Sequence, residues 1–392
     1  MSYQAVKEYL AVIQEGYKKS PKHEKTRILT EASRITGLSR KHVVRMLGLP
    51  PLKLLRRKSS GRPKKYPFKD LLPHIQFLWN QMERISASRM KEAYSDWLHL
   101  YQNPEFTQAI RFMIDQMSVS TLERILRQIR GAEKVTKGLS TTRCPARFMK
   151  NKIPLNTFDQ KIDRPGFMQS DTVAHCGNTT AGQYISSVTL TDIYSAWTEI
   201  RAIFTKQGHE VRKCFTALRT EIVFEILAIN TDSGSEFLNS PVLQFIKGRD
   251  GQKKIAFTRS RPYQKNDNCY VEQKNFTHVR ELFGYERFED EELIELMNEI
   301  YRDYWNPLQN FFIPTFKLKE KMRVGSKIVK KYGRPETPYN RLINSSQLTN
   351  EQKEKLKEQK KALNPFTLKT EMEAKLETFF ERVRRLKAGK AA

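Results

Sequence analysis

The stretch Glu225–Phe237, EILAINTDSGSEF, decides the fold of this chain. Its apolar first half predicts a strand, and Gly234 permits a tight turn directly after Asp232. Two other segments also carry an acid next to a predicted strand or helix. They are GFMQSDTVAHCG (166–177), with Asp171, and SRPYQKNDNCYVEQKNF (260–276), with Glu272. Carboxylate oxygens are the ligands that hard divalent cations prefer. The three acids therefore predict a metal site, provided that the fold brings them together.

The segments around these acids alternate in their predicted secondary structure. Strands are expected at 167–173, 184–191, 197–203, 222–231 and 255–257, and helices at 209–220, near 236–246 and from 269 onward. Three strands followed by alternating helices and strands predict an α/β fold with a mixed central sheet.

The context of the three acids resembles the DDE triad of the retroviral-integrase-type transposases, a family that includes bacterial insertion-sequence transposases. Asp232-Ser233-Gly234-Ser235-Glu236-Phe237 resembles the turn that follows the second acid of that family. Arg261-Pro262-Tyr263, continuing to Val271-Glu272, resembles its loop into the glutamate helix, and the match covers roughly 165–310. Two features depart from the pattern. The interval before Glu272 is longer than usual, and Val279 stands where a basic residue is frequent, with Arg280 one step further.

This resemblance implies an RNase H-like catalytic core over 165–312 in which Asp171, Asp232 and Glu272 are catalytic. It also implies that they bind Mg²⁺ (or Mn²⁺), as two ions that activate the attacking oxygen and steady the leaving one. The implied reaction is cleavage of DNA at transposon ends and strand transfer into target DNA. Joining two ends implies a homo-oligomer. A retroviral integrase proper is disfavoured, because the N-terminal region lacks a His/His/Cys/Cys zinc pattern.

Composition agrees with a nucleic-acid partner. The formal net charge is +27, from 70 Lys and Arg against 43 Asp and Glu. No apolar run approaches the ~18–20 residues of a membrane span, so we expect no membrane partner. The four cysteines form no CxxC pair, which disfavours a disulfide framework and a zinc site. We expect a cytoplasmic, nucleoid-associated protein.

The N-terminal third predicts DNA-binding modules. Residues 1–50 suggest a helix-turn-helix whose second helix, from residue 40, presents Arg40, Lys41 and Arg45, although an ordinary hairpin with a basic solvated face is the alternative. The linker 51–67 is basic, and Gly61-Arg62-Pro63 resembles the core of an AT-hook; a nonspecific tether is the alternative. Its candidate DNA contacts are Arg57, Arg62 and Lys64.

A second helical module is expected over 68–131, with helices at 68–84, 88–101 and 122–130. Arg124 and Arg127 are its candidate DNA contacts, and the alternative is that the module only packs on the core. Residues 132–164 are predicted to be a linker.

Near the third acid, Lys265, Lys274 and Arg280 are candidate phosphate contacts, with a solvated basic face as the alternative. We interpret Asp192 as structural and Glu236 as a helix-start residue, and His175 is left out of the core site.

The C-terminal part is expected to begin with a break in the helical pattern at 306–312. Residues 313–345 are basic and predicted to be irregular, and helices follow at 347–363 and 368–386. The helices suit packing on the core or on another subunit.

The sequence therefore favours a transposase. A noncatalytic transposase-derived DNA-binding regulator and an RNase H-like nuclease remain as alternatives.

Overall fold

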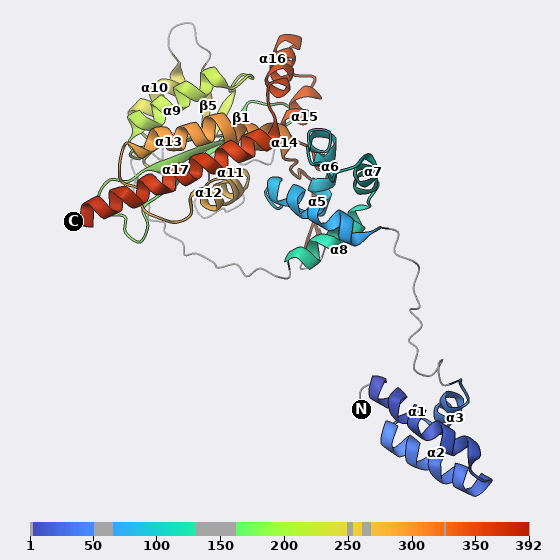
Figure 1. Cartoon of the computed structure of the whole chain (residues 1–392). Coiled ribbons are helices and arrows are strands. Elements are labelled where there is room, and N and C mark those ends of the chain that lie inside the picture. Colours follow the sequence, from blue (N-terminus) through green and yellow to red (C-terminus); the bar gives the residue numbers. More distant parts are fainter. Residues whose placement is uncertain are drawn as a thin grey trace. The chain divides into compact units, whose positions relative to one another are not determined.

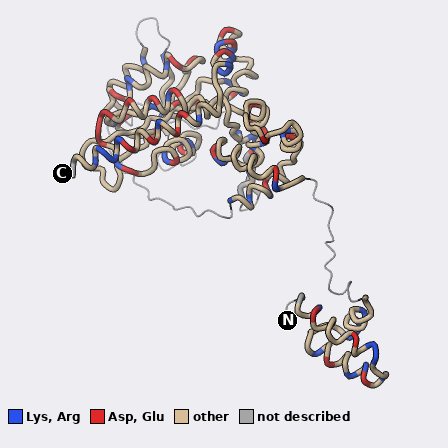
Figure 2. The backbone as a smooth tube through the Cα atoms, viewed as in Figure 1, with Lys and Arg blue, Asp and Glu red and all other residues tan. Residues whose placement is uncertain are grey.

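The computed structural model describes residues 3–50, 66–130, 162–248, 254–260, 268–324 and 327–391. The chain divides into two compact units, Met1–Tyr66 and Pro67–Ala392 (Figure 1). Each unit is described by itself below. Lysine and arginine are interspersed with acidic residues over the helices of both units (Figure 2). In the described part of the chain, no helix is both long and apolar enough to cross a membrane.

The first unit consists of α1 (Tyr3–Lys19), α2 (Lys22–Thr36) and α3 (Arg40–Leu47). Gly37 adopts the left-handed conformation between α2 and α3, and its N–H bonds the carbonyl of Ser33 at 3.0 Å. Ser39 caps α3 by accepting from the N–H of His42. α3 therefore begins at residue 40, as the sequence predicted. Whether they read DNA stays a prediction.

The second unit begins with α5 (Phe68–Gln81), α6 (Ala87–Trp97), α7 (Gln108–Asp115) and α8 (Val119–Arg130), of which α7 was not predicted. This module packs on the C-terminal part of the chain. The indole of Trp97 donates to the carbonyl of Phe312 at 3.2 Å, and Lys360 pairs with Asp96 at 2.8 Å. The module therefore packs on the rest of its unit, and whether α8 also contacts DNA stays a prediction.

A five-stranded sheet forms the centre of this unit. Its strands are β1 (Phe167–Ala174), β2 (Ser186–Asp192), β3 (Thr198–Ile203), β4 (Ala228–Thr231) and β5 (Ala256–Arg259). The order is β3-β2-β1-β4-β5. β1, β2 and β3 are antiparallel neighbours, whereas β4 runs parallel to both β1 and β5. The predicted mixed α/β sheet is confirmed, and its order is compatible with an RNase H-like core.

β4 is shorter than predicted. The strand begins at Ala228 rather than at Ile222, although the whole run is apolar. Ile222, Phe224 and Ile226 are buried outside the sheet, so their hydrophobicity reflects core packing and not strand pairing. The chain enters β4 where Ala228 donates to the carbonyl of Gly166 at 3.1 Å.

Helices flank the sheet. α9 (Gly208–Glu221) and α10 (Ser240–Lys247) pack on each other. The helix that begins with α11 (Cys269–Lys274) continues through a π-helical segment, η2 (Asn275–Arg280), into α12 (Glu281–Phe283). A second helix runs from α13 (Leu293–Glu299) through the π-helical η3 (Ile300–Trp305) into α14 (Asn306–Phe312).

The predicted break at 306–312 is therefore wrong. Pro307 lies in the first turn of α14, directly after η3. A π-helical turn has a wider hydrogen-bond pattern than an α-helix, and a proline in the first turn after it needs no donor of its own.

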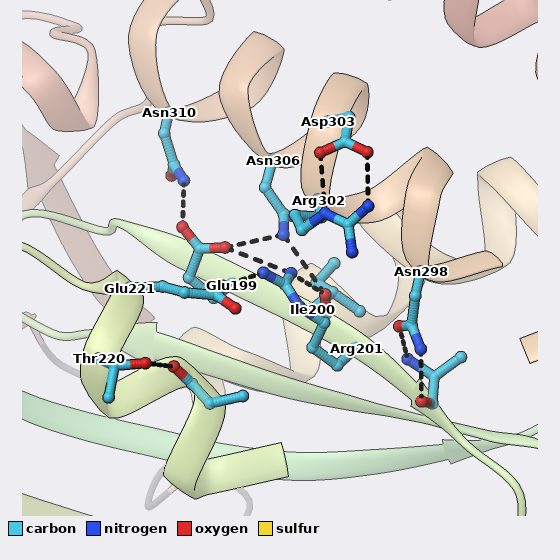
Figure 3. Close-up of polar contacts among 12 residues, drawn as sticks. Glu199, Ile200, Arg201, Thr220, Glu221, Asn298, Arg302, Asp303, Asn306 and Asn310 are labelled. Atoms are coloured by element: carbon cyan, nitrogen blue, oxygen red, sulfur yellow. Dashed lines mark hydrogen bonds and ion pairs between the residues drawn. The ribbon is translucent and has the colours of Figure 1, made fainter. Parts of the chain in front are cut away.

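The edge strand β3 is covered by asparagines of this second helix (Figure 3). Asn298 bonds both the N–H and the carbonyl of Ala202, at 2.8 and 3.1 Å. Asn310 does the same for Thr198, at 2.9 Å in both bonds. Because an edge strand presents unpaired backbone groups, these amides replace the missing neighbouring strand and fix the helix against the sheet.

Residues 313–345 are not irregular as predicted. They contain an antiparallel hairpin, β6 (Leu318–Val324) and β7 (Lys327–Tyr332), followed by α15 (Pro338–Ile343). Lysines spaced along both strands obscured the pattern, because a two-stranded hairpin with two solvated faces has no apolar alternation to detect.

The chain ends with α16 (Asn350–Lys361) and α17 (Pro365–Ala391). α17 runs beside α13 (Figure 1), and Phe379 packs against Phe283 and Phe288 at ring distances of 5.0 and 5.1 Å. Of the two packing alternatives, α17 therefore packs on the core of its own chain.

Candidate active site

The sheet topology brings two of the three acids together. β1 and β4 are parallel neighbours, and Ser170 pairs with Thr231. Asp171 and Asp232 each follow one of these residues, so they lie side by side at the point where β4 ends. The carboxyl ends of adjacent parallel strands are where open α/β sheets commonly bind ligands. Strand register alone therefore creates a pair of neighbouring carboxylates.

This proximity is visible in the electrostatics of Asp171. Burial, and next the negative charge of Asp232, raise the pKa of Asp171 to about 7. Two donors hold its oxygens: the N–H of Thr172 at 2.8 Å from Oδ1 and the amide of Asn275 at 2.7 Å from Oδ2. A second negative carboxylate opposes ionisation of Asp171, so a cation bound between the two would stabilise the charged form.

The turn after Asp232 shapes the same site. The N–H of Gly234 donates to Asp232 Oδ1 at 2.9 Å. A Cβ at position 234 would lie 2.4 Å from Oε2 of Glu236 and 2.9 Å from Oδ1 of Asp232. A larger residue there would have to displace one of the two carboxylates.

Glu236 is not the helix-start residue that we expected. α10 begins at Ser240, with Asn239 as its cap. Glu236 instead turns toward β1, where its Oε1 accepts from the hydroxyl of Thr172 at 2.8 Å and from Lys206 at 3.4 Å. The turn motif could have predicted this position, because a glutamate four residues after Asp232 can reach back over the turn to the neighbouring strand.

Lys206 was also not predicted as a site residue. It lies in the loop between β3 and α9 and lowers the pKa of Asp171 through its positive charge. It is the described lysine that pairs with Glu236. No local sequence pattern marks this position, because only the fold of the sheet brings the loop to the acids.

The third acid, Glu272, lies on a helix that packs beside β1. It is exposed on α11, the helix whose start is held by the N–H of Tyr270, which donates to Oε1 of Gln169 at 3.1 Å. One turn later the same helix presents Asn275 to Asp171. Within the described ranges, no three His, Cys, Asp or Glu side chains form a group that could hold a metal ion. The convergence of all three acids therefore remains a prediction.

The donors that do converge fit a hard divalent cation. Asp171 and Asp232 supply carboxylate oxygens, and Oδ1 of Asn275 is buried without a hydrogen-bond partner in the described structure. Oxygen donors of this kind are preferred by Mg²⁺ and Mn²⁺. A cation would compete with the Asn275 amide for Oδ2 of Asp171.

The candidate DNA contacts fall into three groups. Five are exposed on helices: Arg40, Lys41, Arg45, Arg124 and Arg127. Four lie outside the described residues: Arg57, Arg62, Lys64 and Lys265.

The remaining two are engaged inside the protein. Lys274 is buried and lies 3.2 Å from Nε2 of His278, so it is not on the surface. Arg280 is partly buried and donates to the carbonyl of Ala174 at 2.9 Å.

Asp192 and His175 are structural. Asp192 is buried and accepts from the N–H groups of Gly166 and Ser195, at 2.8 and 2.7 Å. His175 is buried beside Ser187 at 2.8 Å, and burial lowers its pKa to about 3, so it stays neutral.

Comparison with known proteins places this geometry in context. No family model matches the sequence. Two solved structures are similar: the catalytic core domain of BIV integrase, with 18% identity and a TM-score of 0.22, and a simian T-cell lymphotropic virus intasome in complex with PP2A regulatory subunit B56 gamma, with 16% identity and a TM-score of 0.24. The matches cover 28% and 43% of this chain, and 62% and 53% of those chains, which is less than two thirds of either.

The sequence is 30% identical to "Uncharacterized protein y4rM" of Sinorhizobium fredii (strain NBRC 101917 / NGR234) over 345 residues. This match covers 84% of the present chain and 93% of y4rM. An identity of this size over nearly the full length of both chains shows that this protein belongs to the same family as y4rM.

Proposed function

We propose that this protein is a transposase of the DDE type, which cleaves and joins DNA at the Asp171–Asp232 site with the help of a divalent metal. The observation that carries the proposal is the register of β1 and β4, which sets Asp171 of β1 beside Asp232 at the point where β4 ends. The resemblance of the flanking motifs and the net charge of +27 support DNA as the substrate.

The chemistry assigned to the site is in-line attack at phosphorus. When bound, Mg²⁺ or Mn²⁺ supplies Lewis-acid activation of an oxygen and neutralises charge on the phosphate. Asp171 and Asp232 would hold the cation, and Glu236 with Thr172 and Lys206 fixes the turn that positions Asp232. Water is the nucleophile for end cleavage, and a 3′-hydroxyl for strand transfer.

Glu272 is the third ligand in this proposal. It lies one helical turn from Asn275, which already contacts Asp171. Its exposed position favours one second candidate, a noncatalytic DNA-binding regulator that retains the fold without a complete site.

The products formed by the purified full-length chain separate these functions. A labelled duplex copied from the DNA that flanks the coding region would be incubated with target plasmid and Mg²⁺ or Mn²⁺. Joined products support the transposase. Cleavage without joining supports a nuclease on the same fold, and retained binding without either product supports the regulator.

A further inference from the structure

A cavity of about 300 Å³ lies within the second unit, beside the helix that carries Glu272. α11 forms one wall through Tyr270 and Lys274. The other walls come from the α5–α6 segment, the end of β2, α14 and the hairpin β6–β7. A volume of this size is at the lower end of the range of small-ligand pockets, about 300–1,000 Å³.

The lining is rich in cations that lack acidic partners. Its cations are Arg89, Lys274, Lys317 and Arg341. In the described structure, none of these four has a carboxylate within ion-pair distance. Arg89 and Lys317 donate instead to the carbonyls of Pro314 and Tyr194, at 2.5 and 2.6 Å. Burying a charge away from water without an opposite charge is costly, so such a cluster calls for an anion.

Acids in the same lining do not balance these cations. Glu83 and Glu281 are its two carboxylates. Glu83 already pairs with Lys369 at 2.5 Å, and Glu281 is the acid whose charge is felt by Arg89. Beyond the lining, Asp192 and Glu336 act on Lys317 through charge, although neither comes within ion-pair distance of it. The cavity therefore has an excess of positive charge.

Other features of the lining suit a nucleotide. The indole N–H of Trp305 is buried and has no acceptor among the described residues. Aromatic rings contribute to the walls, and Phe316 and Tyr332 are about half exposed, so the cavity reaches solvent beside them. Aromatic faces stack on bases regardless of sequence, whereas an unpaired donor and several cations suit phosphate oxygens.

We propose that this cavity binds the phosphate of a nucleotide, with Lys274 and the neighbouring arginines at the phosphate and the aromatic residues at the base or sugar. The nucleotide is either part of a DNA strand or free. The site is separate from the carboxylate pair and does not depend on its chemistry.

The test is calorimetric titration of the full-length protein with inorganic phosphate, dAMP and a 5′-phosphorylated single-stranded oligonucleotide. We expect dAMP to bind at least tenfold more tightly than inorganic phosphate, because the aromatic walls add to its binding. Lys274→Met should weaken phosphate and dAMP at least tenfold. Lys317→Met serves as a second variant with the same expectation, and Lys357→Met, at an exposed site in α16, should change nothing.

Thermal unfolding gives a readout that a purely structural lysine would not produce. Lys274→Met should abolish the rise in Tm that dAMP gives wild type, because the variant lacks the amine that contacts the phosphate. If the oligonucleotide binds and dAMP does not, the site takes a nucleotide of a DNA strand. If the oligonucleotide and dAMP bind with equal affinity, the site takes a free nucleotide.

Wild-type protein that binds none of the three, or lysine variants that bind them unchanged, would overturn the inference. Asp171→Asn should retain dAMP binding, so failure here is distinguishable from failure of the proposed catalytic function.

Discussion

Replacing Asp171 with asparagine should stabilise the metal-free protein, and should do so more at pH 8 than at pH 5. The pKa of this carboxyl is raised from 3.8 to about 7 by burial and by Asp232. The folded state therefore holds the proton more tightly than the unfolded chain. Stability is greatest below the unfolded pKa and falls as pH rises toward the folded one. An asparagine side chain at this position is neutral at every pH and carries no such dependence.

The magnitude follows from the shift. About three pKa units at about 1.36 kcal/mol each limit the cost of ionised Asp171 to about 4 kcal/mol. Of this, about 2.5 kcal/mol develops between pH 5 and pH 8. Asparagine keeps only one acceptor oxygen for the donors Thr172 and Asn275, and this loss of about 1 kcal/mol applies at both pH values.

Urea denaturation in EDTA would measure the free energy of unfolding of wild type and Asp171→Asn at both pH values. The difference between the two proteins should change by about 2.5 kcal/mol in favour of the variant between pH 5 and pH 8. Asp303→Asn, an exposed position paired with Arg302, is the matched control and should show no such change. A difference that is independent of pH would refute the claim that Asp232 and burial oppose ionisation of Asp171.

Three further predictions concern the metal, the turn and the sheet edge. A proton competes with Mn²⁺ for the carboxylate of Asp171, so calorimetry should show Mn²⁺ binding about tenfold more weakly at pH 6 than at pH 8. Equal affinities at the two pH values would count against a metal site at Asp171. Gly234→Ala forces a Cβ against Glu236 and should lower stability by about 1–3 kcal/mol and weaken Mn²⁺ binding, whereas Gly16→Ala, with open space around it, should do neither. Asn310→Ala leaves the N–H and carbonyl of Thr198 without their partner and should cost about 2 kcal/mol in urea denaturation; an unchanged midpoint would show that water replaces the amide.

The sequence predicted the sheet well because each strand contains apolar residues and is bounded by turn residues. Ile200 and Leu190, for example, are fully buried at positions that local pattern marks as core. It failed at Ile222–Leu227, where buried residues outside the sheet have the same composition as strand residues. Apolar composition indicates that a residue is buried. It does not show whether the backbone of that residue pairs with a neighbouring strand.

The site was predicted in part for a similar reason. Asp171 and Asp232 were predicted from the motifs around them, and the register of β1 and β4 then sets them side by side. Glu236, Lys206 and Asn275 were missed, since they reach the acids from a turn, a loop and a helix whose positions only tertiary packing sets. Lys274 was predicted to be a candidate phosphate contact near the acids, but its side chain is buried.

The most direct test of the central claim is single-turnover cleavage of the labelled duplex in Mg²⁺ by wild type, Asp171→Asn, Asp232→Asn and Glu272→Gln, with Asp303→Asn as control. A carboxylate pair that binds the catalytic metal predicts a loss of at least about a thousandfold in rate for the first two variants, with DNA binding retained. The same loss in Glu272→Gln would establish it as the third ligand. Cleavage by Asp171→Asn or Asp232→Asn at the wild-type rate would contradict the assignment of the reaction to this end of the sheet.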